Sequence, residues 1–348
     1  MKHYQPPIFH KIPGYEIVME FKDEPTHLHG YIAVHSTKRG PALGGTRLWQ
    51  YPDQQAALTD VLRLARGMTY KAAGADLSLG GGKAVLIGDA KVIKTPALFE
   101  AYGYYVNLLK GQYITAEDVN TTTADMVHIA KQTPHVVGRE GKSGNPSPFT
   151  ALGVFIGIQA SVAFAMPDKP LANLSFAVQG VGQTGSFIID QLVKAGVQNI
   201  TIADINPTHV HTMVTRYPFL KVVDQTAIFA LPVDVFVPCA LGGILNDATL
   251  PLLKAKIVAG SANNILLDDR VHGPKAKARG ILVAPDFIIN AGGLINVYHE
   301  HHSDYQLEEV NQEVKRIGQR LTRIYQMAKN QDIDPALAAL HYAQQQLK

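Results

Sequence analysis

A glycine-rich turn near the middle of the chain constrains its fold more than any other feature. Residues 180–185 read GVGQTG; they directly follow the apolar run LSFAV and open a helical pattern. A second apolar run, NITIAD, then ends at Asp204, about 20 residues after the last glycine. A strand, a glycine turn, a helix and an acid in this order predict a βαβ unit within a doubly wound parallel sheet.

Each part of this turn has a physical role in binding a dinucleotide. Gly180 permits the tight turn, Gly182 lets the backbone approach a pyrophosphate, and Gly185 lets the helix pack close to the strand. The helix N-terminus offers free N–H groups to the phosphates. Asp204 would accept hydrogen bonds from ribose hydroxyls and repel a 2′-phosphate, so NAD is predicted rather than NADP. The expected cofactor contacts here are Gly180, Val181, Gly182, Gln183, Thr184, Gly185 and Asp204.

The pattern of strands and helices divides the chain in two. Short apolar runs alternate with helical patterns after the segment GREGKSGNPSP (residues 138–148), whose Gly, Pro and Ser content is typical of an interdomain linker. We expect an α/β fold of two domains with a cleft between them. A substrate and catalytic domain would cover residues 1–142, joined by the C-terminal helix 326–348. A Rossmann NAD-binding domain would cover residues 143–325.

Length and composition agree with a soluble enzyme of two domains. A chain of 348 residues exceeds one ordinary core, and a net charge of +3 without a basic run argues against nucleic-acid partners. The single cysteine, Cys239, fits a reducing compartment. The N-terminus lacks the apolar region of a secretory signal, and apolar stretches such as VFIGIQASVAFAM are shorter than a bilayer span. We therefore expect a cytoplasmic protein without a membrane partner.

One lysine of the first domain lies on a helical face that is otherwise apolar. Ala57, Val61, Leu64 and Met68 recur at helical spacing, and the next step along this stripe is Lys71. A charge on an inward face breaks the local pattern, and such exceptions concentrate at functional sites.

Two further charges occur where glycine-rich or apolar segments end. Lys83 follows LSLGGG, where we expect a turn to enter the strand AVLIG, and Asp118 ends the predicted strand ITAEDV. Burial of Lys83 would favour a neutral amine, the form that acts as a base near neutral pH. The alternative is that the lysines are surface residues whose stems lie on apolar neighbours.

A series of motifs resembles one enzyme family. The segments GPALGGTRLW, RLARGMTYKAA, LGGGKAVLIGD, YITAEDV, SGNPSP, VQGVGQTG, PCALGG, AGSANN and APDFIINAGG occur in this order between about residues 39 and 300. In order and spacing they are similar to those of the Glu/Leu/Phe/Val dehydrogenases, and within that family the leucine-specific members are the most similar.

The resemblance implies a role for each of the charged residues. Lys71, in GMTYK, would pair with the substrate α-carboxylate. Lys83, in GGGK, would be the general base that activates water, and Asp118, in TAED, would exchange a proton with the substrate amine. The other substrate contacts that it implies are Gly44, Gly45, Met68, Leu43, Ala116, Asn264, Leu294 and Val297. The further cofactor contacts that it implies are Thr150, Cys239, Ala240, Leu241 and Asn263.

The reaction implied by the resemblance is reversible oxidative deamination of an amino acid to a 2-oxo acid and ammonia. Hydride leaves the α-carbon for NAD, and water activated by Lys83 attacks the resulting iminium carbon. No metal is expected, because charged side chains and backbone dipoles orient the substrate. The family also implies a homo-oligomer.

The implied side-chain pocket is apolar. Where glutamate-specific members have a lysine and a serine, this sequence has Leu43 and Val297, and Ala116 and Leu294 complete the pocket. A second carboxylate buried there would cost on the order of several kcal/mol. Glutamate is therefore expected to be a poor substrate, leucine or another branched-chain amino acid is favoured, and phenylalanine is the alternative. One departure is Asn120, where family members often have glycine; its bulk would alter the pocket floor.

The sequence allows two other interpretations. The run His299, Glu300, His301, His302 suggests a metal, but its spacing suits neither a helix face nor a strand face. A non-catalytic NAD-binding regulator is the alternative from another class of function. Such a protein would be expected to lose costly buried charges, and Lys71, Lys83 and Asp118 are all present.

Overall fold

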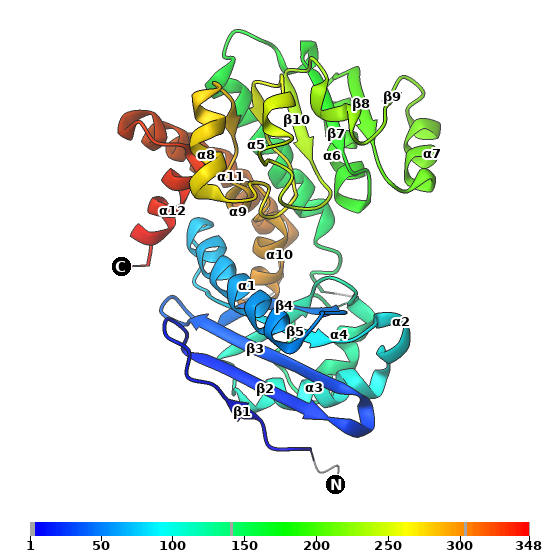
Figure 1. Ribbon diagram of the computed structural model, residues 1–348, viewed down its shortest axis with the longest axis vertical. Coiled ribbons are helices and arrows are strands. Elements are labelled where there is room, and N and C mark those ends of the chain that lie inside the picture. The colour runs from blue at the N-terminus through cyan, green and yellow to red at the C-terminus, as the bar shows by residue number, and fades with distance from the viewer. Residues whose placement is uncertain (1–3, 140–141, 303–304, 348) are drawn as a thin grey trace. The chain divides into compact units, whose positions relative to one another are not determined.

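The computed structural model describes residues 4–139, 142–302 and 305–347, which form two compact units (Figure 1). The first unit comprises Met1–Asn145, Val297–Tyr305 and Gln346–Lys348, and the second comprises Pro146–Asn296 and Gln306–Gln345. The chain thus crosses from one unit to the other within the predicted linker, three residues after the expected boundary.

The first unit is built on a mixed sheet in the order β1-β2-β3-β5-β4-β6. The pairs β1–β2, β2–β3 and β3–β5 are antiparallel, whereas β4 runs parallel to both β5 and β6. The strands are β1 (Ile8–Phe9), β2 (Ile17–Asp23), β3 (Leu28–Ser36), β4 (Ala42–Trp49), β5 (Gly80–Ile87) and β6 (Tyr113–Glu117). The helices are α1 (Gln54–Gly74), α2 (Ala90–Ile93), α3 (Pro96–Leu108) and α4 (Thr123–Ala130).

Alternation along the strands gives this sheet two apolar faces. Val18, Ala33 and Val85 pack against α1, while their neighbours Met19 and Ile32 pack against α3 and α4. A period of two residues is what a strand buried on both faces requires. The sheet is therefore the middle layer of the unit, with α1 on one face and α3 and α4 on the other (Figure 1).

The second unit contains the predicted doubly wound parallel sheet, in the order β12-β11-β10-β7-β8-β9. Its strands are β7 (Ser175–Gln179), β8 (Asn199–Ala203), β9 (Lys221–Val222), β10 (Val235–Pro238), β11 (Ile257–Val258) and β12 (Leu282–Val283). After β7 the chain builds β8 and β9 on one side and then returns to β10 on the other. The glycine turn follows β7, at the switch point where ligands bind in such sheets.

The helices of the second unit cover its sheet and continue to the C-terminus (Figure 1). They are α5 (Ser147–Ala165), α6 (Gln183–Lys194), α7 (Pro207–Arg216), α8 (Asp269–Ala278), α9 (Asp286–Ile289), α10 (Gly292–His302), α11 (Leu307–Gln331) and α12 (Pro335–Gln345). The helix α10 begins in the second unit and ends in the first.

The C-terminal helices belong to the second unit, contrary to the expectation for residues 326–348. The apolar face of α11 packs on α5, where Tyr325 lies 2.7 Å from the Ser161 hydroxyl, and α12 packs against α8 and α11. An amphipathic pattern shows that a helix buries one face, but it does not identify the partner. Gln346 belongs to the first unit, where its carbonyl accepts from Arg39 Nη1 at 2.6 Å.

The helix α5 has 19 residues and is apolar enough to cross a membrane by length and composition alone. It therefore exceeds the length expected from its apolar run. Within the second unit, α5 packs against α6 and α11, and its buried side chains include Val154, Ile158 and Val162.

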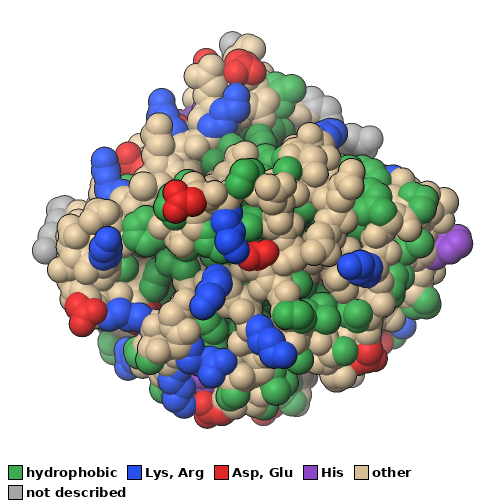
Figure 2. Space-filling model, turned by 90° about the horizontal axis from the view of Figure 1, so that it is seen from above, with side chains coloured by type: hydrophobic (Ala, Val, Ile, Leu, Met, Phe, Trp, Pro, Cys, Tyr) green, Lys and Arg blue, Asp and Glu red, His purple; other side chains and the backbone are tan. Residues whose placement is uncertain are grey.

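The face drawn in Figure 2 carries lysine and arginine side chains interspersed with acidic and apolar ones. Several basic side chains of the second unit have acidic partners: Lys169 pairs with Asp234 at 3.1 Å and Arg216 with Asp190 at 3.0 Å. Such pairing leaves less unbalanced positive charge at the surface of this unit.

Candidate active site

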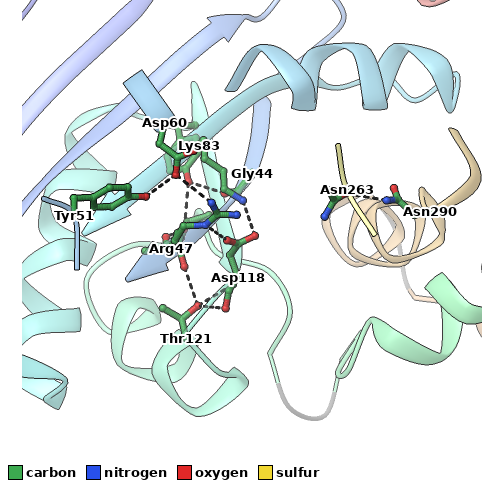
Figure 3. Close-up of polar contacts among 12 residues, drawn as sticks. Gly44, Arg47, Tyr51, Asp60, Lys83, Asp118, Thr121, Asn263 and Asn290 are labelled. Atoms are coloured by element: carbon green, nitrogen blue, oxygen red, sulfur yellow. Dashed lines mark hydrogen bonds and ion pairs between the residues drawn. The ribbon is translucent and has the colours of Figure 1, made fainter. Parts of the chain in front are cut away.

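A buried ion pair joins Lys83 and Asp118, the two predicted catalytic residues (Figure 3). The Lys83 side chain is only 6% exposed, and its Nζ donates to Asp118 Oδ1 at 2.6 Å. Lys83 lies within β5, and Asp118 follows directly after the end of β6. Gly80, Gly81 and Gly82 also belong to β5, so the turn expected before Lys83 is wrong.

The strand β4 lies between β5 and β6, and its two glycines make the pairing possible. Leu43 pairs with Gly81 and Thr46 with Ala84, which sets Gly45 across from Lys83. A Cβ atom on Gly45 would lie 2.8 Å from Asp118 Cβ, and one on Gly44 would lie 1.7 Å from the Gly82 carbonyl oxygen. These glycines therefore allow the close approach of neighbouring strands, a role in addition to the substrate contact that the resemblance implies.

Alternation places the predicted residues of the sheet on its α1 face. Leu43 and Gly45 share that face on β4, Lys83 lies on it in β5, and Ala116 is the partner of Gly45 on β6. Asp118, two residues after Ala116, continues the same face. The structure thus brings together the two catalytic candidates and two of the pocket candidates within one unit.

Arg47 was not singled out from the sequence, yet it contacts the same carboxylate. Its Nε donates to Asp118 Oδ2 at 3.1 Å, and its Nη1 donates to Asp60 Oδ2 of α1 at 3.1 Å. The Tyr51 hydroxyl also donates to Asp60 Oδ2, at 2.6 Å (Figure 3). The available indication was an arginine on the same strand face as Leu43 and Gly45, in a strand that is buried from Ala42 to Thr46.

Opposite charges control the ionisation of Asp118. Burial alone would raise the pKa of its carboxyl group, but the neighbouring charges of Lys83 and then Arg47 outweigh burial and hold that pKa well below its usual range. Lys83 and Arg47 thus flank the Asp118 carboxylate, with one cation at each oxygen. The resting arrangement is therefore an ionised pair with a second cation beside it.

A tight turn holds Asp118 at the end of β6. The Thr121 hydroxyl accepts from the Asp118 backbone N–H at 2.8 Å and donates to the Thr46 carbonyl at 2.9 Å. Asn120 has φ 59°, in the left-handed region, and its Nδ2 donates to the Leu48 carbonyl at 3.0 Å. The backbone conformation explains why glycine is frequent at this position, since asparagine also tolerates it. Asn120 thus bonds the β4 backbone, and an altered pocket floor stays a prediction.

The predicted apolar stripe of α1 is shifted by one position at its C-terminal end. The buried line runs through Ala57, Val61, Ala65 and Thr69, and Thr69 lies so close to β5 that a Cβ on Gly81 would be 2.0 Å from its backbone nitrogen. Leu64, Met68 and Lys71 lie along the edge of this line and are half-buried. At such an edge position, a lysine stem can pack on the helix surface.

The glycine turn of the second unit has the features expected for a dinucleotide site. Gly180 has φ +92°, and a Cβ on Gly185 would lie 2.1 Å from the Gly180 carbonyl oxygen. A Cβ on Gly182, in contrast, would meet nothing within 4 Å. Gly182 precedes the first residue of α6, so this open side lies beside the free N–H groups of a helix N-terminus. The turn therefore fits a phosphate approaching the backbone at Gly182.

Asp204 follows β8 and closes the turn from the other side. Its Oδ2 accepts from the Val181 backbone N–H at 2.7 Å, and its Oδ1 accepts from the Asn206 N–H at 2.7 Å. The loop after β10 also contacts the turn, because a Cβ on Gly180 would lie 2.9 Å from the Ala240 nitrogen. Cys239 in that loop is shielded, and burial raises the pKa of its thiol. Leu241 is 80% exposed.

The remaining predicted residues of the second unit lie in its loops and helix starts. Asn263 accepts from Asn290 Nδ2 at 2.8 Å (Figure 3), and the backbone N–H of Asn264 donates to the Asp286 carboxylate. Thr150 lies in the first turn of α5 and bonds the Pro146 carbonyl at 3.1 Å. Asn290 and Asp286 therefore support Asn263 and Asn264. Both supporting residues belong to the motif APDFIINAGG, but the motif did not indicate their partners.

The apolar pocket candidates are divided between the units. Leu43, Ala116 and Val297 belong to the first unit and Leu294 to the second, and all four side chains are buried.

Glu300, from the histidine-rich run, anchors the linker. Its Oε2 accepts from the Gly138 N–H at 2.8 Å and from the Ser143 backbone and hydroxyl. Among residues 4–139, 142–302 and 305–347, no three His, Cys, Asp or Glu side chains are grouped so as to hold a metal ion.

Known proteins resemble this chain over nearly its full length. The family model for the Glu/Leu/Phe/Val dehydrogenase dimerisation domain matches residues 15–135, and the Glutamate/Leucine/Phenylalanine/Valine dehydrogenase model matches residues 207–348. Leucine dehydrogenase of Geobacillus stearothermophilus is 44% identical over 337 residues, covering 96% of this chain and 91% of the relative. Phenylalanine dehydrogenase of Caldalkalibacillus thermarum is 41% identical, covering 98% of this chain and 93% of the relative.

A solved structure agrees with both the sequence and the fold. L-tryptophan dehydrogenase of Nostoc punctiforme is 43% identical over 334 residues, covering 96% of this chain and 94% of the relative. The crystal structure of that enzyme matches with a TM-score of 0.82, covering 96% of each chain. The chain belongs to the Glu/Leu/Phe/Val dehydrogenase family and is an amino-acid dehydrogenase.

Proposed function

We propose that this enzyme catalyses the reversible, NAD-dependent oxidative deamination of an L-amino acid with an apolar side chain, with leucine as the preferred substrate. The observation that carries this proposal is the buried Lys83–Asp118 pair, 2.6 Å between Nζ and Oδ1, on the same sheet face as Leu43 and Ala116. A base, a carboxylate and an apolar surface are the groups that such a reaction requires.

The chain's own residues would divide the chemistry as follows. When bound, NAD supplies a hydride acceptor for the substrate α-carbon. The Asp118 carboxylate stabilises the positive charge on the substrate nitrogen as the iminium forms. Lys83, once it has released its proton, takes a proton from the water that attacks the iminium carbon. The carbinolamine then loses ammonia, with Asp118 exchanging the proton on nitrogen, and leaves the 2-oxo acid.

Lys71 would bind the substrate α-carboxylate. It lies on the same helix as Asp60, at the edge of the buried face of α1. A cation at this edge pairs with a carboxylate without the full cost of burying either charge.

NAD rather than NADP is the proposed cofactor. The Asp204 carboxylate lies against the glycine turn, bonded to the Val181 N–H, so a 2′-phosphate near it would meet a negative charge. The open side of Gly182 and the start of α6 would take the pyrophosphate. Thr150, Cys239, Ala240, Leu241 and Asn263 are the other proposed cofactor contacts.

Leucine is proposed as the substrate because the pocket candidates are all apolar. Leu43 is 2% exposed and Ala116 is 7% exposed, and neither offers a partner to a side-chain carboxylate. Phenylalanine is the second candidate, and tryptophan becomes a third because a tryptophan-specific relative is as similar as the leucine-specific one. One methylene changes discrimination by only about 1–3 kcal/mol, so the choice among them depends on pocket volume.

The test is an assay of NADH absorbance with purified protein over leucine, valine, isoleucine, methionine, phenylalanine, tryptophan and glutamate at alkaline pH. We expect turnover with leucine and the other branched-chain amino acids, little with glutamate, and a strong preference for NAD over NADP. Faster turnover with an aromatic amino acid would overturn the substrate proposal alone. Absence of turnover with every apolar amino acid would overturn the reaction as well.

We also propose a cytoplasmic homo-oligomer. The edge strand β1 exposes Ile8 by 55% and Phe9 by 59%, and exposed strand edges favour pairing with another chain. The family model over residues 15–135 is described as a dimerisation domain. A single cysteine fits a reducing compartment.

A further inference from the structure

Arg47 bridges two carboxylates that come from different elements of the first unit. Its Nε contacts Asp118 Oδ2, after β6, and its Nη1 contacts Asp60 Oδ2, on α1, each at 3.1 Å. The side chain is 25% exposed, so the pairs are shielded from water over most of their surface. Burial would lower the pKa of the guanidinium, but the charges of Asp118 and Asp60 outweigh it and the pKa is raised.

The proposed reaction creates an electrostatic problem for Asp118. At rest its two oxygens are divided between two cations, with Oδ1 on Lys83 and Oδ2 on Arg47. When Lys83 releases its proton, the buried carboxylate loses one of those cations, and a buried charge without a partner is costly. An arginine does not release its proton at any pH that enzymes meet, so Arg47 remains as the compensating charge.

We propose that Arg47 is a positioning residue for the deamination reaction: it fixes the Asp118 carboxylate and compensates its charge while Lys83 alternates between its charged and neutral forms. This inference rests on the proposed function of the Lys83–Asp118 pair. Arg47 shares the negative charge of Asp118 and adds a positive charge near Lys83. Both effects favour release of the lysine proton, so Arg47 sets the pH above which the base becomes available.

The surroundings of Arg47 fix the geometry of the bridge. Asp60 faces it from α1, Lys83 from β5 and Asp118 from the turn after β6, while Tyr51, in the loop before α1, donates to Asp60 at 2.6 Å. A planar guanidinium can direct separate N–H groups at two carboxylates, whereas an ammonium group concentrates its charge at one atom. Arg47 and Gly45 lie on one face of β4, so the bridge lies next to the glycine that makes room for the ion pair.

The test compares pH profiles of kcat/KM for deamination in variants whose charges change in opposite directions. In Arg47→Gln the rising limb of the profile moves to higher pH, by about one unit, because the ammonium form of Lys83 gains the whole Asp118 charge. In Asp60→Asn the rising limb moves to lower pH. Arg47 then has Asp118 as its one carboxylate partner among these contacts, so less of its positive charge is neutralised and it favours release of the Lys83 proton more strongly. A purely structural role predicts no shift of the limb in either variant.

Two further variants separate charge from shape. Arg47→Lys keeps the positive charge, so the rising limb of its pH profile stays near that of the unmodified enzyme. Its kcat falls by about tenfold or more, because one ammonium group cannot hold both carboxylates in position. Tyr51→Phe removes the hydroxyl contact to Asp60 and no charge, so its limb does not move.

Opposite shifts in Arg47→Gln and Asp60→Asn, with the Tyr51→Phe limb unmoved, support the proposal. An unshifted limb in a folded Arg47→Gln protein overturns it. If Arg47→Gln does not fold, Asp60→Asn decides alone, and an unshifted or raised limb there overturns the proposal. Failure of the proposed function is a separate result, since it appears as absence of turnover in the unmodified enzyme.

Discussion

At the scale of single residues, Asp118 is held between two cations of the first unit. Its side chain is 22% exposed and contacts two cations, each through a different carboxylate oxygen. Removing one member of a buried pair leaves the other charged and unpaired, which costs about 3–5 kcal/mol. The site is therefore stable only while the pair is intact, and its members affect both folding and chemistry.

The depressed pKa of Asp118 makes a prediction about stability and pH. Because that pKa is lower in the folded protein than in the unfolded chain, the stability it contributes is fully present above the unfolded value of about 3.9 and is lost as the pH falls through the folded value. Asp118→Asn should lower the free energy of unfolding by about 3 kcal/mol at pH 7. Urea titrations should show this difference unchanged down to about pH 4 and shrinking below it. A difference that shrinks between pH 7 and pH 5 would contradict this account.

Asn120 gives a second prediction at this scale. Its φ of 59° is left-handed, so Asn120→Ala should cost about 1–2 kcal/mol of unfolding free energy, whereas Asn120→Gly should be nearly neutral. Denaturant unfolding of the two variants makes the comparison. Equal losses would show that the hydrogen bond to Leu48, rather than the backbone conformation, determines the residue at this position.

At the scale of elements, the glycines of β4 determine how closely the strands of the first sheet approach. Gly44→Ala places a Cβ 1.7 Å from the Gly82 carbonyl oxygen, so β4 and β5 must separate, and we expect a loss of about 1–3 kcal/mol together with loss of turnover. Gly67→Ala is the matched control. Gly67 lies in α1 with nothing within 4 Å of an added Cβ, and alanine there should stabilise the helix by about 0.5–1 kcal/mol. Thermal unfolding of Gly44→Ala and Gly67→Ala tests this prediction, and equal changes in unfolding temperature would contradict it.

The turn before α6 allows a similar comparison between a ligand contact and a packing contact. Gly182→Ala adds a methyl group that meets no protein atom within 4 Å, so the protein should unfold at the same temperature but bind NAD more weakly. Gly185→Ala would bring a Cβ within 2.1 Å of the Gly180 carbonyl oxygen and should lower the unfolding temperature itself. Calorimetry with and without NAD distinguishes the two. Undiminished NAD affinity in Gly182→Ala would show that the pyrophosphate does not bind at this turn.

At the scale of the whole molecule, the sequence predicted what depends on local order along the chain. The parallel sheet and its glycine turn were predictable because the strand, turn, helix and Asp204 follow one another within a short segment. The catalytic roles of Lys83 and Asp118 were implied by family motifs, and the structure adds the contact between them. The Arg47 bridge could not be predicted, because its partners Asp60 and Asp118 are brought to it by the helix and strands of the sheet.

The assignment of the C-terminal helices failed for a related reason. The spacing of apolar residues in α11 shows that the helix buries one face, but only the folded chain shows that α5 covers it. In α1, the predicted apolar stripe through Leu64 and Met68 lies next to the stripe that is buried, which runs through Ala65 and Thr69. Neighbouring stripes on a helix differ by one residue.

The central claim is that the Lys83 amine performs chemistry and does not merely support the fold. Its most direct test is the Lys83→Ala variant, compared with the unmodified enzyme for turnover of leucine and for NAD binding by isothermal titration calorimetry. Our account predicts that turnover falls below detection while the NAD affinity and the fold, followed by circular dichroism, are retained. Turnover within about tenfold of the unmodified enzyme would contradict the account, because loss of a general base typically costs a factor of about 100 or more.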